Sequence, residues 1–193
     1  MREHTGELVQ QLQELLQEQG RVILAIDGTS AALKSTLADY LAGELDGTVI
    51  HCDDFFLPMA LRSEARYQEP GGNIHYERMK AEVIEPLGCA RSHRFNYMRY
   101  DCSKGELGER CAVPDVPLRI VEGAYALHPY FGKYYDLGVF LTVDEQMQMW
   151  RIEKRNPNPG MFREKWIPLE RKYFQVYDIP AKADLILDTT FWM

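Results

Sequence analysis

The sequence predicts an α/β fold in which a central parallel sheet carries helices on both faces, giving three layers. Short apolar runs alternate with segments of helical periodicity along the chain, an order typical of βαβ units. The run Val22–Ile26 is apolar throughout, as in strands that are buried on both faces of a parallel sheet. A glycine-led turn, 28–36, then separates this strand from a helical segment.

Length and composition favour a single soluble domain spanning residues 1–193. A chain of 193 residues with 46% hydrophobic and 26% charged residues is neither disordered nor dependent on disulfides for its core. The net charge of -7 disfavours nucleic acid and anionic membranes as partners. No apolar signal region begins the chain, and its cysteines show no zinc or disulfide spacing. We therefore expect a cytoplasmic protein with reduced thiols.

The predicted elements follow the apolar pattern in chain order. Leucines at helical spacing, ended by Gly20, predict an amphipathic helix over residues 1–20. Gly/Pro-rich polar sequence predicts a loop over 59–74, and alternating aromatic and charged residues predict a hairpin over 95–113. Strands are predicted over 22–26, 48–52, 118–121, 137–143 and 183–187, and further helices over 35–45, 76–87, 145–155 and 166–177.

The turn after the first strand carries the strongest functional signal. Gly28, Lys34 and Ser35 match the phosphate-binding pattern GxxxxGK[ST] between a strand and a helix. In that pattern backbone N–H groups surround the β-phosphate, the lysine reaches the β- and γ-phosphates, and the serine hydroxyl holds Mg²⁺. The residues expected to bind the nucleotide here are Gly28, Thr29, Ser30, Ala31, Ala32, Leu33, Lys34, Ser35 and Thr36.

Leu33 departs from this pattern because it stands where the second glycine belongs. Glycine lets the backbone approach phosphate without a Cβ, and a left-handed conformation costs another residue roughly 1–2 kcal/mol. Taken alone, the turn is equally compatible with a strand–turn–helix that contains a lysine by chance. Other segments of the chain decide between these interpretations.

Five segments together resemble the uridine kinase-like branch of the P-loop small-molecule kinases, which includes uridine/cytidine kinases, phosphoribulokinase and pantothenate kinase. They are IDGTSAALKSTLADYLA, HCDDFF, EPGGNIHYERM, IVEGAYALHP and RIEKRNPNPGMFREKWIPLERKYF, and they run from about Arg21 to Asp188. The resemblance implies a P-loop NTPase-type fold with a small lid over 151–165. It also implies ATP and Mg²⁺ as cofactors, a small-molecule acceptor such as a nucleoside, and the homo-oligomers common in that family.

The resemblance assigns catalytic roles to residues at strand ends and in the lid. Asp53 would accept the proton of the attacking hydroxyl and contact the acceptor, although a turn-capping role is the alternative. Glu122 would hold Mg²⁺ together with Ser35, or contact the acceptor; a strand-end surface glutamate is the alternative. Arg151 and Arg155 lie four residues apart and would close over ATP, although a solvated helix face explains the same charges.

The acceptor side is less clearly marked. Tyr97 and Tyr100 resemble residues of the hairpin that holds the nucleoside in uridine kinases, and His75 stands where relatives carry an acid that binds acceptor hydroxyls. Loop aromatics pack against a core as often as they contact ligands. Two hypotheses follow: an ATP-dependent kinase acting on a nucleoside or other polyol, or a catalytically impaired relative that binds a nucleotide or ligand, as Leu33 and His75 favour.

Overall fold

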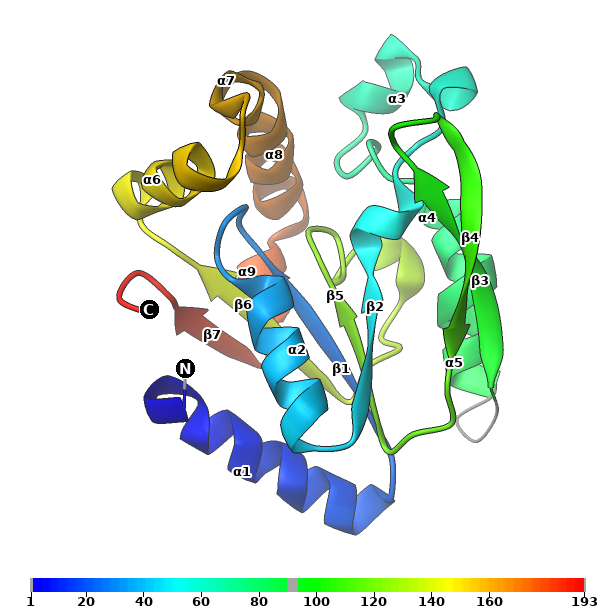
Figure 1. Ribbon diagram of the computed structural model, residues 1–193, viewed down its shortest axis with the longest axis vertical. Coiled ribbons are helices and arrows are strands. Elements are labelled where there is room, and N and C mark those ends of the chain that lie inside the picture. Colours follow the sequence, from blue (N-terminus) through cyan, green and yellow to red (C-terminus); the bar gives the residue numbers. More distant parts are fainter. Residues whose placement is uncertain (1, 90–93, 193) are drawn as a thin grey trace.

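The core of the protein is one five-stranded sheet whose strand pairings are all parallel (Figure 1). The computed structural model describes residues 2–89 and 94–192. Within them the strand order is β2-β5-β1-β6-β7. The strands are β1 (Val22–Gly28), β2 (Gly47–His51), β5 (Leu118–Glu122), β6 (Leu137–Thr142) and β7 (Leu185–Asp188). The predicted parallel sheet is therefore confirmed, and β1 is its central strand.

Helices cover both faces of this sheet, because successive side chains of each strand point to opposite sides. Ile23 and Ala25 of β1 face one apolar layer, and Leu24 and Ile26 face the other. One face packs against α1 (Arg2–Gln19) and α2 (Lys34–Glu44). The opposite face packs against α4 (Tyr76–Met79), α5 (Glu85–Cys89), α8 (Ile167–Tyr177) and α9 (Ile179–Lys182). The three predicted layers are present.

The predicted hairpin is also present and lies beside the sheet as a separate pair of strands (Figure 1). It consists of β3 (Phe95–Asp101) and β4 (Glu106–Val113), with an irregular register between Met98 and Tyr100. The segment expected to be a loop, 59–74, contains a 3-10 turn, η2 (Met59–Leu61), and the short helix α3 (Glu64–Gln68). Two further 3-10 turns are η1 (Cys52–Phe55) and η4 (Pro129–Phe131).

Two helices contain a π-helical turn that the periodicity did not predict. The first, η3 (Lys80–Ile84), lies between α4 and α5; the second, η5 (Phe162–Trp166), lies between α7 (Pro159–Met161) and α8. Each turn ends two residues before a proline, Pro86 or Pro168. Proline has no backbone N–H and clashes with the preceding helical turn. The helical hydrogen bonds therefore change to the wider π pattern in the turn before the proline.

The lid expected over 151–165 begins in the last turns of α6 (Glu145–Arg155) and continues through α7 into η5, above the ends of β1 and β6 (Figure 1).

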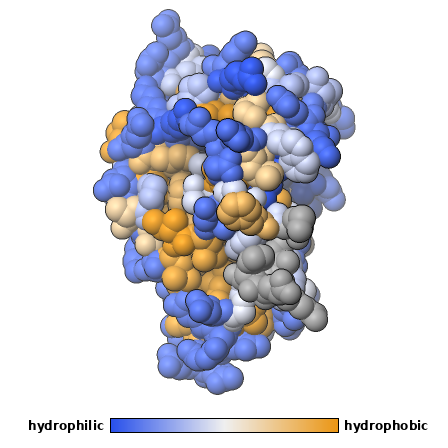
Figure 2. All heavy atoms as spheres, turned by 90° about the vertical axis from the view of Figure 1, so that its left-hand side faces the viewer, coloured by the Kyte–Doolittle hydropathy of each residue, from blue (hydrophilic) through white to orange (hydrophobic). Residues whose placement is uncertain are grey.

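No helix among the described residues is long and apolar enough to span a membrane. Figure 2 shows apolar side chains gathered in the middle of one face, between hydrophilic margins. Exposed apolar residues of the chain include Trp150, Ile186 and Phe191, the last 82% exposed. Self-association stays a prediction.

Candidate phosphotransfer site

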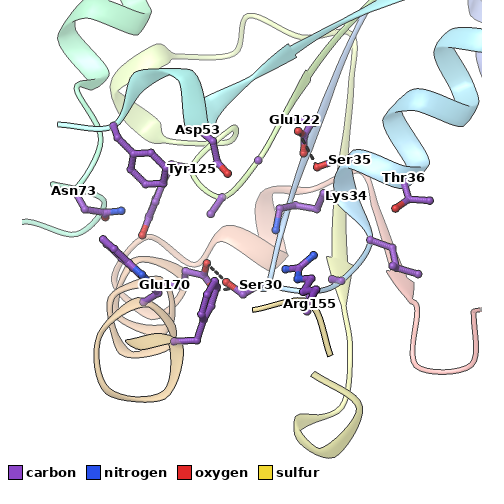
Figure 3. Close-up of a pocket in the computed structure, with 18 residues that line it drawn as sticks. Ser30, Lys34, Ser35, Thr36, Asp53, Asn73, Glu122, Tyr125, Arg155 and Glu170 are labelled. Atoms are coloured by element: carbon purple, nitrogen blue, oxygen red, sulfur yellow. Dashed lines mark hydrogen bonds between the residues drawn. The ribbon is translucent and has the colours of Figure 1, made fainter. Parts of the chain in front are cut away.

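A cavity of about 310 Å³ lies at the carboxyl ends of β1, β2 and β5. In open parallel sheets, ligands bind beyond these strand ends, where neighbouring connections leave in opposite directions. Here β1 has β5 on one side and β6 on the other. The cavity is lined by Ser30, Ala31, Ala32, Leu33, Lys34, Ser35, Thr36, Asp53, Phe56, Asn73, Glu122, Gly123, Ala124, Tyr125, Arg155, Phe162, Trp166 and Glu170 (Figure 3).

The glycine-led turn has the backbone shape that the phosphate-binding pattern requires. Gly28 has φ 143°, and a Cβ there would lie 2.1 Å from the backbone oxygen of Leu141, so only glycine fits. Leu33 adopts φ 64° and ψ 28°, the left-handed conformation, at the start of α2. Its side chain packs partly against the apolar layer that includes α2. The loop therefore keeps the glycine-like conformation at Leu33, at a cost of roughly 1–2 kcal/mol.

Lys34 and Ser35 open α2 and face the end of β5. The Lys34 ammonium donates hydrogen bonds to the backbone oxygens of Gly28 (2.8 Å) and Thr29 (2.9 Å). The Ser35 hydroxyl donates to Glu122 Oε1 at 3.1 Å (Figure 3). Lysine, serine and strand-end glutamate thus line one cavity, although they come from elements far apart in the sequence.

His51, at the end of β2, is a neighbour of Glu122 that sequence reasoning missed. Its Nδ1 lies 2.5 Å from Glu122 Oε1. The hydrogen bond to Glu122 raises the pKa of His51, against the opposing effect of burial. Its signal in the sequence was only its position two residues before Asp53 at a strand end.

Asp53 and Asp54 point in different directions. The Asp53 carboxylate is exposed to the cavity, but the protein around it and the charge of Glu122 raise its pKa. The Asp54 carboxylate is 7% exposed and accepts hydrogen bonds from the Tyr97 hydroxyl (2.7 Å) and from Arg99 Nε (2.8 Å). Asp53 is therefore the aspartate available to a ligand, while Asp54 anchors the hairpin.

Glu170, on α8, is a second residue that motif reasoning missed. It is 7% exposed, and its carboxylate accepts hydrogen bonds from the Ser30 N–H (2.9 Å) and the Ser30 hydroxyl (2.5 Å). Burial raises its pKa, and the charge of Lys34 opposes this shift. A carboxylate on the apolar face of a helix, between Ile167 and Phe174, was the signal in the sequence. Glu170 ties α8 to the phosphate-binding turn.

Asp27, directly before the turn, is buried completely and connects three segments. Its carboxylate accepts from the N–H groups of Gly28 (2.7 Å), Tyr125 (3.2 Å) and Leu127 (2.9 Å), and from the Tyr173 hydroxyl (2.8 Å). Burial raises the pKa of Asp27. These bonds hold the turn after β5, where Tyr125 has φ 81°, against the end of β1.

The two lid arginines differ in position. Arg155 lines the cavity. Arg151 does not; its guanidinium donates to the backbone oxygens of Ala31 (3.1 Å), Thr189 (2.6 Å) and Trp192 (3.0 Å). The structure therefore places Arg151 as a link between α6, the phosphate-binding turn and the C-terminal segment, and its expected contact with ATP stays a prediction.

Of the expected acceptor residues, Asp53 lines the cavity, but Tyr97, Tyr100 and His75 do not. Tyr97 and Tyr100 are each 4% exposed, and Tyr97 is held by Asp54. His75 lines a separate hollow beside Arg66 and Glu77, where burial lowers its pKa. The lining of the cavity includes instead Phe56, Asn73, Tyr125, Phe162 and Trp166. Both hairpin tyrosines turn inward: Tyr97 packs in the apolar layer and donates to Asp54, whereas the buried Tyr100 hydroxyl has no hydrogen-bond partner among the described residues.

The residues present fit the expected Mg²⁺. Among the described residues, no group of three or more His, Cys, Asp or Glu side chains forms a metal site made by protein alone. Magnesium instead takes one or two carboxylates together with water and substrate phosphate oxygens. The hydroxyl of Ser35 and the carboxylate of Glu122, hydrogen-bonded to each other in the cavity, supply this kind of oxygen donor.

Comparisons with solved structures agree with this fold. No family model matches the chain, and no curated protein matches it. Among solved structures, a possible uridine kinase from Bacillus stearothermophilus aligns with a TM-score of 0.67 at 22% identity, covering 94% of this chain and 100% of that one. A proposed fructose transport system kinase from Silicibacter sp. TM1040 aligns at 0.64 and 20%, covering 93% and 98%. The chain therefore has the α/β fold of the P-loop kinases.

Proposed function

We propose that this protein is an ATP-dependent kinase that transfers the γ-phosphoryl group to a hydroxyl of a small molecule, with a nucleoside such as uridine as the expected acceptor. One observation carries the proposal: Lys34, Ser35, Asp53 and Glu122 lie at or just beyond the carboxyl ends of β1, β2 and β5 and line the same cavity. Phosphoryl transfer needs little more than positioning and charge neutralisation, and these side chains supply both.

The chemistry follows from the charges of these groups. Lys34 would exchange the backbone oxygens of Gly28 and Thr29 for phosphate oxygens and neutralise charge on them. Bound Mg²⁺ supplies further neutralisation of the phosphates. Asp53 would accept the proton as the acceptor oxygen bonds to the γ-phosphorus and ADP leaves. Its raised pKa makes it a stronger proton acceptor than a carboxylate surrounded by bulk water.

The same cavity also supports a second candidate, a nucleotide- or ligand-binding module without turnover. Leu33 occupies the left-handed position at the start of α2, and Glu170 already occupies the Ser30 N–H. Both features weaken phosphate binding. Leu33 adds a Cβ where the turn would contact phosphate, and Glu170 places a negatively charged carboxylate beside the same turn.

Calorimetric titration with ATP–Mg²⁺, followed by an ADP-release screen of nucleosides and polyols, separates the two candidates. Micromolar ATP binding with acceptor-dependent ADP release supports the kinase. Binding without ADP release for any acceptor supports the binding module. Absence of ATP binding in both the parent and Leu33→Gly contradicts both candidates as nucleotide-dependent proteins.

A further inference from the structure

Ala31, in the middle of the phosphate-binding turn, has a conformation that alanine rarely adopts. Its φ is 62°, in the left-handed region, and the residue is only 4% exposed. A residue with a Cβ keeps such a conformation only where its surroundings determine it from several sides. The groups around Ala31 therefore decide whether the turn keeps the shape in which it can hold phosphate.

The apolar surroundings of Ala31 come from the helices at the lid. Its side chain belongs to a small apolar cluster with Ile152 of α6 and Ile167 of α8, and Met149 and Phe162 pack against this cluster. The cluster is distinct from the two apolar layers that cover the sheet. Ala31 thus lies between α6 and α8, and the positions of these helices restrict its backbone.

The polar surroundings of Ala31 include a side chain of α6. Arg151 Nη1 donates a hydrogen bond to the backbone oxygen of Ala31 at 3.1 Å. This oxygen and the N–H of Ala32 belong to one peptide group, and that N–H donates to the backbone oxygen of Thr29 at 3.2 Å. Because a peptide group is planar, one hydrogen bond at each end fixes its orientation.

The guanidinium of Arg151 is itself held in place by the C-terminal segment. It donates to the backbone oxygens of Thr189 (2.6 Å) and Trp192 (3.0 Å) and to the Thr189 hydroxyl (3.2 Å). A guanidinium has its N–H donors in one rigid plane, so oxygens of several segments together fix its position. Arg151 does not line the cavity, and it therefore acts on the turn from outside it.

We propose that Arg151 is a positioning residue that holds Ala31 in the left-handed conformation and so keeps the turn in the shape that binds the triphosphate of a nucleotide. The inference rests on the proposed kinase function and assigns to Arg151 a role through the turn, without contact with ATP. Loss of Arg151 then weakens the binding of any triphosphate, with or without a nucleoside attached, because the turn itself has changed.

The first test compares ATP–Mg²⁺ with tripolyphosphate–Mg²⁺ by calorimetry. Arg151→Met removes the donors and keeps an unbranched side chain. We expect it to weaken binding of both ligands by the same factor, about tenfold or more, as is usual when a hydrogen bond from a charged group is lost. Arg151→Lys still has a donor for the Ala31 oxygen and should lose less. Arg163→Met, at a lid arginine whose side chain is 69% exposed, is the matched control and should bind both ligands like the parent.

The second test asks whether the effect passes through Ala31. Glycine adopts the left-handed conformation without strain, so Ala31→Gly should make the turn less dependent on Arg151. In a double-mutant cycle, we therefore expect Arg151→Met to weaken triphosphate binding by a smaller factor in the Ala31→Gly background than in the parent. Direct contact between Arg151 and phosphate predicts the same factor in both backgrounds.

Hydrogen exchange measured by NMR supplies a test that needs no nucleotide. The Ala32 N–H stays bonded to Thr29 only while the peptide group that follows Ala31 keeps its orientation. We expect Arg151→Met to accelerate exchange at Ala32 and to leave it unchanged at Leu37, whose N–H bonds within α2 to the Leu33 oxygen at 2.9 Å. If Arg151→Met does not fold, Arg151→Lys should show a smaller change in the same direction.

Four results would overturn the inference. Unchanged binding of both ligands would remove the role, and a loss for ATP but not for tripolyphosphate would assign Arg151 to contact with the nucleoside part. Equal losses in the two backgrounds would assign it to phosphate, and equal acceleration at Ala32 and Leu37 would assign it to overall stability. Failure of the kinase proposal looks different: the parent binds neither ligand, while exchange at Ala32 still reports whether Arg151 holds the turn.

Discussion

Leu33 is the residue at which the sequence and the proposed chemistry disagree most directly. Its strain is present in the folded chain, since φ is 64°, and its Cβ adds bulk beside the phosphate path. Leu33→Gly removes both. Relief of the strain, about 1–2 kcal/mol, stabilises the folded chain with or without nucleotide, so we expect the loss of the Cβ to be what lets ATP–Mg²⁺ bind more tightly. Calorimetry measures this change. Leu33→Ala keeps the Cβ and the strain, so an equal gain in that variant would contradict the explanation.

Asp53 is the residue whose proposed role is purely chemical. Asp53→Asn retains the size of the side chain and removes the proton acceptor, so we expect kcat to fall by roughly 10²–10⁴-fold. ATP affinity should stay within a few-fold, because the phosphate-binding turn is not altered. Stopped or coupled ADP-release assays and calorimetry report the two quantities separately. A parallel loss of both would assign Asp53 to metal binding or to structure instead.

At the scale of elements, the phosphate-binding turn is held by the helices on either side of the lid. The backbone oxygen of Ser30 accepts a hydrogen bond from the Gln148 side chain on α6 (3.0 Å), and the Ser30 N–H donates to the Glu170 carboxylate on α8 (2.9 Å). Glu170→Ala leaves a buried N–H without a partner, and we expect a loss of about 1–3 kcal/mol in unfolding free energy. Denaturant titration measures it. Glu170→Gln can accept from the Ser30 N–H and should not show this loss.

The same pair of variants carries a pH signature. Burial raises the pKa of Glu170 above 4.5, so the folded state holds its proton at pH values where the unfolded state has lost it. Stability from this group is therefore lost as pH rises above 4.5 through the folded pKa. We expect Glu170→Gln to gain stability relative to the parent over that range and to match it more closely at lower pH. A difference independent of pH would contradict the assignment.

Elements and sites differ in how far the sequence predicts them. Strand β1 was predictable because it is buried at every position, so its sequence is a continuous apolar run. Gly28, Lys34 and Ser35 were predictable because they form a pattern within one short stretch of the sequence. The π turns depend on prolines that lie beyond the turns themselves. Glu170 and Asn73 reach the cavity only through tertiary packing, Glu170 across 140 residues, so no spacing rule contains them.

At the scale of the whole molecule, His128 is a buried base on which acid stability depends. It is 4% exposed, and its ring lies against those of Tyr76, Phe131, Tyr173 and Tyr177. Nδ1 accepts from the Tyr130 N–H, which leaves Nε2 as donor to the backbone oxygen of Pro70, both at 3.1 Å. Only the neutral ring makes both bonds, and burial lowers the pKa of His128 from 6.5 to about 4.

Acid should therefore destabilise the protein through His128 before the bulk of its carboxylates protonate. Between pH 6.5 and about 4 the unfolded chain binds this proton and the folded chain does not. The free energy of unfolding therefore decreases as the pH is lowered, by roughly 3 kcal/mol when the pH reaches about 4. Asp27 and Glu170, whose raised pKa values act in the opposite sense, mask part of this loss, so the test compares variants. Denaturant titrations from pH 7 to 4 should show a shallower decline for His128→Gln, which keeps the donor to Pro70, and parallel curves would show that His128 titrates normally.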